Sequence, residues 1–427
     1  MHETDVLTRV GPGTPMGEFM REYWIPACMS SELVADAPPM RLKLLGEELL
    51  AFRTTSGRAG VMDHRCPHRA VSLFYGRNEN DGLACVFHGW KFDAEGRCVD
   101  QPNLPPQQRS LDRVRAKAYR VTEKAGVVWV YMGRRALPPP MPDFPALAMP
   151  RERLSVWSEQ RECNYLQCLE GEIDTSHAGF LHMGLLHAEA ANGPQGSNID
   201  VINRTIEYKV HDTDYGVIAG GYRPLGDNEL YWRLANYLFP FYTQPPPNAF
   251  GAEAVMRAWV PMDDTHTMLI SVTTDTYLMA QGPRAARPPS HVPGLSFDYE
   301  YLPNTTDWYG RWRLSANRRN DHLMDRSVQK DGSYTGIEGL DVQDAAMQES
   351  MGEIVDRGFE YLVPSDLAVI RTRKRMLGAL QALAEGTAPP GVDRPEVYRQ
   401  CSGYITAPQA IDMRQLYEDE RRKAVTA

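Results

Sequence analysis

Two short stretches decide the fold of the first part of this chain, Cys66-Pro67-His68 and Cys85-Val86-Phe87-His88. Each stretch pairs one thiol with one imidazole, and sixteen residues separate the two pairs. Tetrahedral zinc also accepts two cysteines and two histidines, but zinc fingers pair cysteine with cysteine and histidine with histidine. The interleaved order instead matches a two-iron, two-sulfur cluster that has both histidines on one iron. The predicted ligands are Cys66 and Cys85 on one iron and His68 and His88 on the other.

The residues around these stretches predict a small all-β domain. Short apolar runs at 41–45, 48–52 and 127–132 read as strands separated by turns. The run 136–145 is rich in proline, which cannot donate to a sheet and favours an extended connection. We therefore expect three parts: an N-terminal segment at 1–39 that packs on the catalytic domain, a small iron-sulfur domain at 40–135, and a catalytic domain at 136–427.

Length and composition limit the other function classes. A chain of 427 residues fits two domains, because single cores usually stop growing at roughly 250 to 300 residues. A net charge of -9 without a basic cluster predicts no nucleic-acid partner. Seven scattered cysteines argue against a disulfide framework. No apolar run approaches the roughly 18 residues of a membrane span and no signal-peptide pattern is visible, so we expect a cytoplasmic protein without membrane contact.

The second part of the chain has an α+β pattern. Strand-like stretches occur at 204–210, 216–222, 229–239, 253–260 and 267–274, with turn residues between them. From Ser365 to Gly386 the leucines and isoleucines recur at helical spacing. The pattern predicts a single antiparallel sheet with helices packed against it.

Two histidines five residues apart, His177 and His182, form a second group of metal-ligand type. Five residues of an α-helix rotate by about 500°, so these side chains would diverge by roughly 140° on a straight helix. A local break at Gly179 would let both imidazoles converge. Two histidines and one carboxylate make the site of non-haem ferrous oxygenases. The residues alone leave five carboxylates eligible as the third ligand: Asp321, Asp325, Asp341, Asp344 and Glu349.

With both groups in view, the sequence resembles the oxygenase α subunits of the Rieske non-haem iron oxygenases, most closely the phthalate dioxygenase-like branch that includes aromatic O-demethylases. The resemblance covers nearly the whole chain. Its motifs are 7–17, the two Cys/His pairs, 170–182, 259–264 and 343–352. The resemblance implies a small all-β Rieske domain followed by a helix-grip (START-like) catalytic domain, with a central antiparallel sheet and C-terminal helices.

The resemblance also implies residue roles. Asp344 matches the aspartate that completes a mononuclear Fe(II) site with His177 and His182. Asp174 matches the aspartate that, in the family, bridges to a cluster histidine of the adjacent subunit in a head-to-tail homotrimer. The alternative interpretation of Asp174 is a helix-cap carboxylate close to the iron ligands.

The function implied is that of the oxygenase component of a multicomponent system. It would use O2 and electrons from NAD(P)H to hydroxylate a small aromatic substrate, by ring dihydroxylation or by oxidative O- or N-dealkylation. The chain has no nucleotide-binding glycine fingerprint, so the electrons must arrive from a separate flavin and iron-sulfur reductase, in some systems through a ferredoxin. A carboxylated substrate would need an arginine in the pocket, and Arg223 and Arg233 are the two candidates. An arginine on a strand is, however, more often solvated or paired at the protein surface.

Two other functions are alternatives to an oxygenase, an electron carrier and a zinc-stabilised binding protein. A non-catalytic Rieske electron-transfer protein would need the first domain alone and would leave His177, His182 and Asp344 without a role. A zinc-stabilised binding protein would be colourless, whereas a Rieske cluster gives a red-brown protein.

Overall fold

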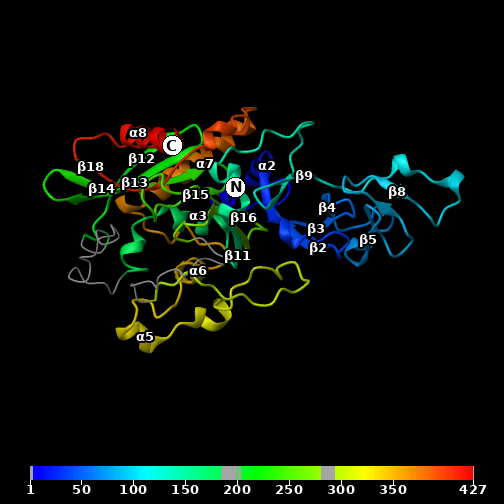
Figure 1. Cartoon of the computed structure of the whole chain (residues 1–427), viewed down its shortest axis with the longest axis horizontal. Coiled ribbons are helices and arrows are strands. Elements are labelled where there is room, and N and C mark those ends of the chain that lie inside the picture. Colours follow the sequence, from blue (N-terminus) through cyan, green and yellow to red (C-terminus); the bar gives the residue numbers. More distant parts are fainter. Residues whose placement is uncertain (1–2, 184–199, 201–202, 280–293, 427) are drawn as a thin grey trace.

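The computed structural model describes residues 3–183, 200, 203–279 and 294–426, and these form two lobes (Figure 1). The small lobe carries strands β2 to β8 and projects at one end of an elongated molecule. The large lobe contains a broad antiparallel sheet with helices packed on it. The predicted α+β class is therefore confirmed. Within the described part of the chain, no helix combines the length and the apolar content that crossing a bilayer requires.

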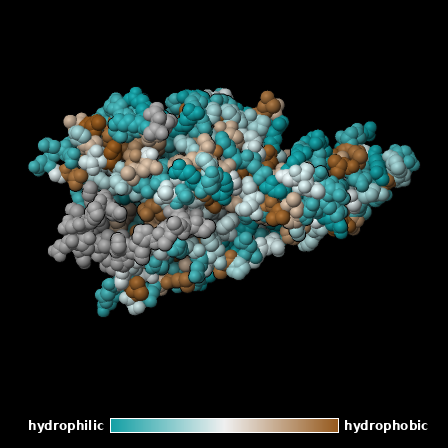
Figure 2. Space-filling view, viewed as in Figure 1, coloured by the Kyte–Doolittle hydropathy of each residue, from teal (hydrophilic) through white to brown (hydrophobic). Residues whose placement is uncertain are grey.

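The small lobe consists of two short antiparallel sheets. One contains β2 (Met40–Leu44), β3 (Glu47–Arg53) and β4 (Ala59–Asp63), and the other β5 (Arg77–Glu79), β6 (Gly82–Ala84), β7 (Lys91–Phe92) and β8 (Cys98–Asp100). The lobe has its own core, which includes Leu50, Phe52, Leu73, Leu83 and Phe92. Burial of each such side chain contributes roughly 1.5 to 3 kcal/mol. Apolar patches also reach the surface at this end of the molecule (Figure 2).

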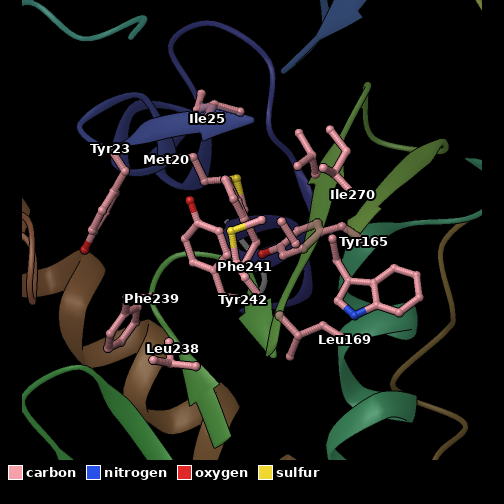
Figure 3. Packing of buried hydrophobic residues seen from close by; sticks show 14 of the residues in the cluster. Met20, Tyr23, Ile25, Tyr165, Leu169, Leu238, Phe239, Phe241, Tyr242 and Ile270 are labelled. Carbon is pink, nitrogen blue, oxygen red and sulfur yellow. The ribbon is translucent and has the colours of Figure 1, made fainter. Parts of the chain in front are cut away.

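The N-terminal segment belongs to both parts of the structure. It forms α1 (Glu3–Thr8), α2 (Pro15–Arg21) and β1 (Trp24–Met29), and β1 pairs with β10 (Val127–Tyr131), which pairs with β9 (Arg120–Lys124). Its side chains Met20, Tyr23 and Ile25 pack among residues of the large lobe (Figure 3). The Tyr165 hydroxyl donates a hydrogen bond to the Leu7 carbonyl at 2.7 Å. The division of the chain after residues 39 and 135 stays a prediction.

The large sheet has eight strands in the order β11-β17-β16-β15-β14-β13-β12, with β18 paired to β14. These strands are β11 (Leu154–Arg161), β12 (Glu207–Thr213), β13 (Gly216–Leu225), β14 (Glu229–Leu238), β15 (Tyr242–Gln244), β16 (Val255–Pro261), β17 (Thr267–Thr274) and β18 (Gly403–Pro408). Every residue of β16 and β17 is buried. Such burial on both faces means that other elements cover this part of the sheet on each side.

The helices of the large lobe place the site residues. They are α3 (Tyr165–Ile173), α5 (Arg326–Asp331), α6 (Leu340–Ser350), α7 (Leu367–Ala384) and α8 (Met413–Thr426). Helix α7 lies against β12 and β13, and α3 contacts β15, β16 and α6. The helix expected from Ser365 to Gly386 is thus present as α7, preceded by a 3-10 turn at Pro364–Asp366.

A carboxyl group and a guanidinium lie together, fully buried, on β11. Glu159 and Arg161 have no exposed surface, and Arg161 Nη2 is 2.5 Å from Glu159 Oε1. Burial raises the pKa of Glu159 to about 8; the Arg161 and Arg257 cations oppose this rise, and the Asp341 and Asp344 charges add to it. The folded protein therefore keeps this carboxyl protonated to a higher pH than the unfolded chain does.

We predict that Glu159→Gln removes a pH-dependent loss of stability. The folded-state pKa lies above the unfolded value of roughly 4.3, so the unfolded chain binds fewer protons between these two pH values. Stability should fall by about 1 kcal/mol per pH unit from this group as pH rises through that window. Thermal unfolding of wild type and E159Q between pH 5.5 and 8.5 measures the difference.

The E159Q curve should be flatter than that of wild type. The matched control is Glu152→Gln, since Glu152 is exposed. Parallel curves for wild type and E159Q would show that Glu159 is already ionised in the folded protein.

Candidate cluster and iron sites

The two Cys/His stretches form two adjacent loops of the small lobe, one after β4 and one after β6. In the first loop, the Cys66 amide donates to the Val71 carbonyl at 2.9 Å, and the Ala70 amide donates to the Cys66 carbonyl at 2.8 Å. The second loop is closed in the same way, because Cys85 N–H donates to Trp90 O and Gly89 N–H to Cys85 O, both at 2.8 Å. Each loop therefore holds its cysteine by backbone hydrogen bonds.

The four side chains of these loops fit a 2Fe-2S cluster. Cys66 and Cys85 are both buried. Burial and, to a smaller extent, the neighbouring Cys85 raise the pKa of the Cys66 thiol to about 11. Two thiolates in this place would need an attached cationic group such as ferric iron. The rings of His68 and His88 lie 4.6 Å apart, and Nδ1 of His88 is buried without a hydrogen-bond partner among the described residues. The sulfur pair and the imidazole pair thus offer the predicted donor set.

Trp90 and Gly89 support the second loop. The indole of Trp90 stacks on the His68 ring with centroids 4.4 Å apart and an interplanar angle of 9°, and its Nε1 donates to Asn103 Oδ1 at 2.9 Å. Gly89 has φ of +78°, and a Cβ there would lie 2.5 Å from Cγ of Pro102. Only glycine meets both conditions without displacing the proline ring.

Helix α3 delivers the two histidines of the second site. It begins at the N-cap Asn164, whose side chain accepts from Leu166 N–H, and ends at Asp174, whose backbone is extended. The chain then forms a 3-10 turn at His177–Gly179. The predicted convergence of His177 and His182 is present, but it arises from this tight turn rather than from an α-helix broken at Gly179. Gly179 is required for another reason, because a Cβ there would lie 2.7 Å from the Asp200 carbonyl oxygen.

Three donor atoms converge at this turn. His177 Nε2 and His182 Nε2 are 3.2 Å apart, and Asp344 Oδ1 of α6 lies 3.6 Å and 3.4 Å from them. Bonds of about 2 Å to one ion at right angles place neighbouring ligand atoms about 3 Å apart. The ligand atoms of these three side chains all lie within 4.8 Å of one another, so they could hold one metal ion. Their arrangement fits a facial two-histidine, one-carboxylate iron site.

Gln343 fixes the orientation of His182. Its side-chain amide donates to the carbonyls of Gly294 and Ile337 at 3.0 and 2.9 Å, so its oxygen faces His182 Nδ1 at 2.8 Å. His182 must then donate from Nδ1, which leaves the lone pair of Nε2 directed at the site. The sequence contained the signal for this role, since Gln343 directly precedes Asp344, but spacing alone gave it no function.

Asp174 lies at the end of α3 and also faces a histidine of the proposed iron site. Its Oδ1 accepts from Ser176 N–H at 2.7 Å and from the Tyr208 hydroxyl at 3.1 Å, as a helix-end carboxylate does. Its Oδ2 lies 3.6 Å from His177 Nδ1. Burial would lower the pKa of His177, but the approach of its Nδ1–H to the Asp174 carboxylate and the charges of Asp344 and Asp174 outweigh burial and raise that pKa. Tyr208, which the sequence did not single out, holds one oxygen of Asp174 while the other faces the histidine.

The other four eligible carboxylates lie elsewhere. Asp341 binds Arg257 and Tyr299, and Glu349 Oε2 is 2.9 Å from His322 Nε2. Asp325 is exposed and caps α5. Asp321 is exposed in a turn with φ of +53°. The structure therefore brings Asp344 alone among the five to the histidine pair.

Comparisons with known proteins agree with this geometry. The Rieske [2Fe-2S] domain family matches residues 23–120, and the family described as LigXa C-terminal domain like matches residues 130–426. The oxygenase subunit of 3-chlorobenzoate-3,4-dioxygenase from Comamonas testosteroni is 47% identical over 421 residues, which is 97% of each chain. The chain belongs to the Rieske oxygenase α subunits. The predictions of family, enzyme class and Rieske cofactor domain are confirmed.

Other relatives define the branch of this Rieske oxygenase subunit. The oxygenase subunit of phthalate 4,5-dioxygenase from Pseudomonas putida is 36% identical and covers 96% of this chain and 93% of its own. The oxygenase subunit of 5,5'-dehydrodivanillate O-demethylase from Sphingobium sp. is 30% identical, with 92% and 83% covered. The crystal structure of dicamba monooxygenase bound to dicamba shares the fold, with a TM-score of 0.57 and 18% identity over 86% of this chain and 99% of that one. This Rieske α subunit is thus the oxygenase component of a multicomponent aromatic-oxidising system.

We predict that Asp344→Ala loses the mononuclear iron and keeps the cluster. Loss of a residue that only hydrogen-bonds to a metal ligand typically weakens metal binding about 10- to 100-fold. Removal of one of the three ligands themselves should weaken iron binding at least as much. Total iron per chain should fall by about one atom, measured by mass spectrometry of metals, while the visible cluster spectrum persists.

The control is Asp325→Ala, an eligible carboxylate that the structure places on the surface. This variant should keep its iron. Full iron content and normal turnover in D344A would exclude Asp344 as the third ligand.

Proposed function

We propose that this Rieske oxygenase α subunit dihydroxylates the ring of an aromatic carboxylate. Both atoms of O2 enter the ring, NAD(P)H supplies two electrons through a separate reductase, and the product is a cis-dihydrodiol. The observation that carries the substrate class is a pair of arginines near the iron site, the buried Arg223 on β13 and the mostly buried Arg233 on β14.

The two arginines share one carboxylate. Arg223 Nη1 lies 2.6 Å from Asp200 Oδ1, and Arg233 pairs with the other oxygen of Asp200. Arg233 is near enough to His177 for its charge to oppose the raised pKa of that imidazole. Among the described residues, Asp200 is the one carboxylate that an ion pair joins to these two arginines, so the three side chains together carry one net positive charge. A carboxylate ligand would supply both the missing charge and the acceptor oxygens.

Unpartnered polar atoms in this group support the same ligand class. Among the described residues, Arg223 Nη2, Arg233 Nε and the Tyr231 hydroxyl are buried and make no hydrogen bond. Buried donors of this kind cost free energy unless an acceptor meets them. The two relatives that are 47% and 36% identical are named as dioxygenases of 3-chlorobenzoate and of phthalate, which are both aromatic carboxylates.

The residues of this chain would act around the iron as follows. His177, His182 and Asp344 would hold the iron, which would supply the O2-activating chemistry, and the four Cys/His ligands would hold the cluster as the source of electrons. Gln343 holds His182 in the tautomer that offers Nε2. Arg233 would hold the substrate carboxylate and thereby orient the ring toward the triad. Tyr208 fixes one oxygen of Asp174, so that the other stays directed at His177.

We predict that Arg233→Gln raises KM for benzoates by roughly 100-fold, because a charge-assisted hydrogen-bonded pair contributes about 3 kcal/mol. Arg223 still compensates Asp200 in this variant, so the buried charges balance. Initial rates with a benzoate and with the corresponding neutral benzamide measure the effect.

The benzamide separates charge recognition from damage to the pocket. The rate with benzamide should change little in R233Q. Lys209→Gln, which removes an exposed cation on β12, should leave the rates with both substrates unchanged. An equal loss for benzoate and benzamide would contradict carboxylate recognition.

We also propose that the working unit is a head-to-tail homotrimer, in which the small lobe of one chain meets the large lobe of the next. Both lobes expose apolar side chains: Val86 and Phe87 beside the cluster loops are 56% and 50% exposed, and Phe359 and Tyr361 are 92% and 91% exposed. The second pair lies next to α3, because Arg357 and Arg373 both bind Glu170 one turn before Asp174. Such patches indicate a protein interface.

Charge supports this pairing of unlike ends. Residues 40–135 hold 17 of the 46 Lys and Arg but 10 of the 55 Asp and Glu, so this part carries +7 and the remaining residues carry -16. Opposite charges on the two ends favour contact between the small lobe of one chain and the acidic body of another. In this arrangement Asp174 would link His68 or His88 of one chain to His177 of the next.

The electron donor and the compartment complete the proposal. A flavin and iron-sulfur reductase, directly or through a ferredoxin, would reduce the cluster. All seven cysteines are free thiols, which suits the reducing cytoplasm. A non-catalytic electron carrier is the less favoured function, because it gives no role to the His177, His182 and Asp344 group.

We predict that Asp174→Asn slows oxidation of the reduced cluster by O2 roughly 10- to 100-fold in single turnover, in line with the loss of a residue that orients a metal ligand. Asparagine keeps an oxygen for Ser176 and Tyr208 but removes the charge facing His177. Stopped-flow absorbance of the cluster follows the reaction.

The control is Asp212→Asn, an aspartate of β12 that pairs with Arg371. It should match wild type, and all three proteins should be trimeric by native mass spectrometry. Unchanged cluster oxidation in D174N, with the cluster fully reducible, would exclude the proposed bridge.

A further inference from the structure

One buried arginine connects α6, which carries Asp344, with α3, which leads into the turn of His177 and His182. Arg257 of β16 has 1% exposed surface. Its Nε pairs with Glu172 of α3, and its Nη2 donates to Asp341 of α6 at 3.1 Å. A single guanidinium therefore contacts a carboxylate on each helix.

Both carboxylates stand close to site residues in the sequence. Glu172 precedes Asp174 by two residues and His177 by five, and Asp341 precedes Asp344 by one helical turn. The helices also touch directly, since a Cβ on Gly171 of α3 would lie 2.7 Å from Nε2 of Gln348 on α6. A change in the separation of α3 and α6 would move Asp344 relative to both histidines.

Further hydrogen bonds prevent the two carboxylates from turning away. The second oxygen of Glu172 accepts from Trp259 Nε1 at 2.6 Å and from the Thr243 hydroxyl. The second oxygen of Asp341 accepts from the Tyr299 hydroxyl at 2.7 Å. Each acid is thus held from two sides, and the planar guanidinium joins them with a fixed geometry that a lysine ammonium cannot reproduce.

We propose that Arg257, with Glu172 and Asp341, is a positioning clamp that sets the distance between α3 and α6 and so tunes metal affinity at the iron site. The three residues of the clamp are neither metal ligands nor part of the proposed carboxylate-binding group at Arg233. The inference rests on the proposed ligand set His177, His182 and Asp344. Its consequence is that a substitution in the sheet, behind the site, alters how the site binds metal.

The test is metal titration of Arg257→Lys. Full-length protein with an intact cluster is freed of mononuclear iron, and Co(II) binding is measured by calorimetry and by the Co(II) visible spectrum. If the clamp sets the site, R257K should bind Co(II) about 10-fold more weakly than wild type does, at the lower end of the range for residues that orient metal ligands. Its Co(II) spectrum should also differ from that of wild type.

The matched control is Arg21→Lys. Arg21 is likewise buried and pairs with Glu47 at 3.1 Å, but it joins α2 to β3. R21K should lower the unfolding temperature to a similar extent and bind Co(II) as wild type does. Wild-type affinity and spectrum in R257K, with a lowered unfolding temperature, would reduce Arg257 to a purely structural residue and overturn the proposal.

Two more variants keep the test decisive. If R257K does not fold, Asp341→Asn replaces it in the titration. Asparagine keeps the size of the side chain and removes the charge on the α6 side of the clamp. Wild-type Co(II) affinity in D341N would then overturn the proposal. Asp344→Ala in the same titration checks the ligand set itself. Undiminished Co(II) binding in D344A would reject the proposed ligands, whereas a loss in D344A with none in R257K would reject the clamp alone.

Discussion

The approach of α6 to the end of α3 is the constraint on which the rest of the structure depends. The His182 to Gln343 hydrogen bond joins residues 161 positions apart in the sequence, and Asp344 must reach both imidazoles at the same place. The large sheet supports both helices. Its strands β16 and β17 are buried along their whole length. Arg161 of β11 and Arg257 of β16 both bind Asp341, where the sheet meets α6.

Some of this arrangement could be predicted from sequence because it is local. The Cys/His loops each need a few residues, and the β17 strand was expected at its observed bounds, Thr267–Thr274. The α7 helix was likewise visible in its apolar spacing. The convergence of His177 and His182 was expected too, although the mechanism differs: a 3-10 turn replaces the broken helix.

Other features depend on contacts that no local pattern contains. Five carboxylates shared the late segment of the chain, and Asp344 was distinguished by a family resemblance rather than by its neighbours in sequence. Gln343, Tyr208 and Arg257 escaped prediction, because each acts through partners that are 34 to 161 residues away. Arg223 and Arg233 were expected as surface-paired residues more readily than as buried ones, yet both share Asp200 in the interior. Burial of a strand arginine becomes apparent only when the elements covering it are known.

The uneven distribution of charge gives the molecule an electric dipole along its length. The positive end is the lobe that holds the two Cys/His loops, and the negative end is the body that holds the His177, His182 and Asp344 group. At low ionic strength such a dipole acts over distances of a Debye length, about 10 Å at 0.1 M salt, before any apolar surfaces touch. An acidic protein that approaches at random is therefore turned toward the loops and repelled by the body. Orientation of this kind raises the fraction of encounters that bring a redox group close to the cluster ligands, without any increase in final affinity.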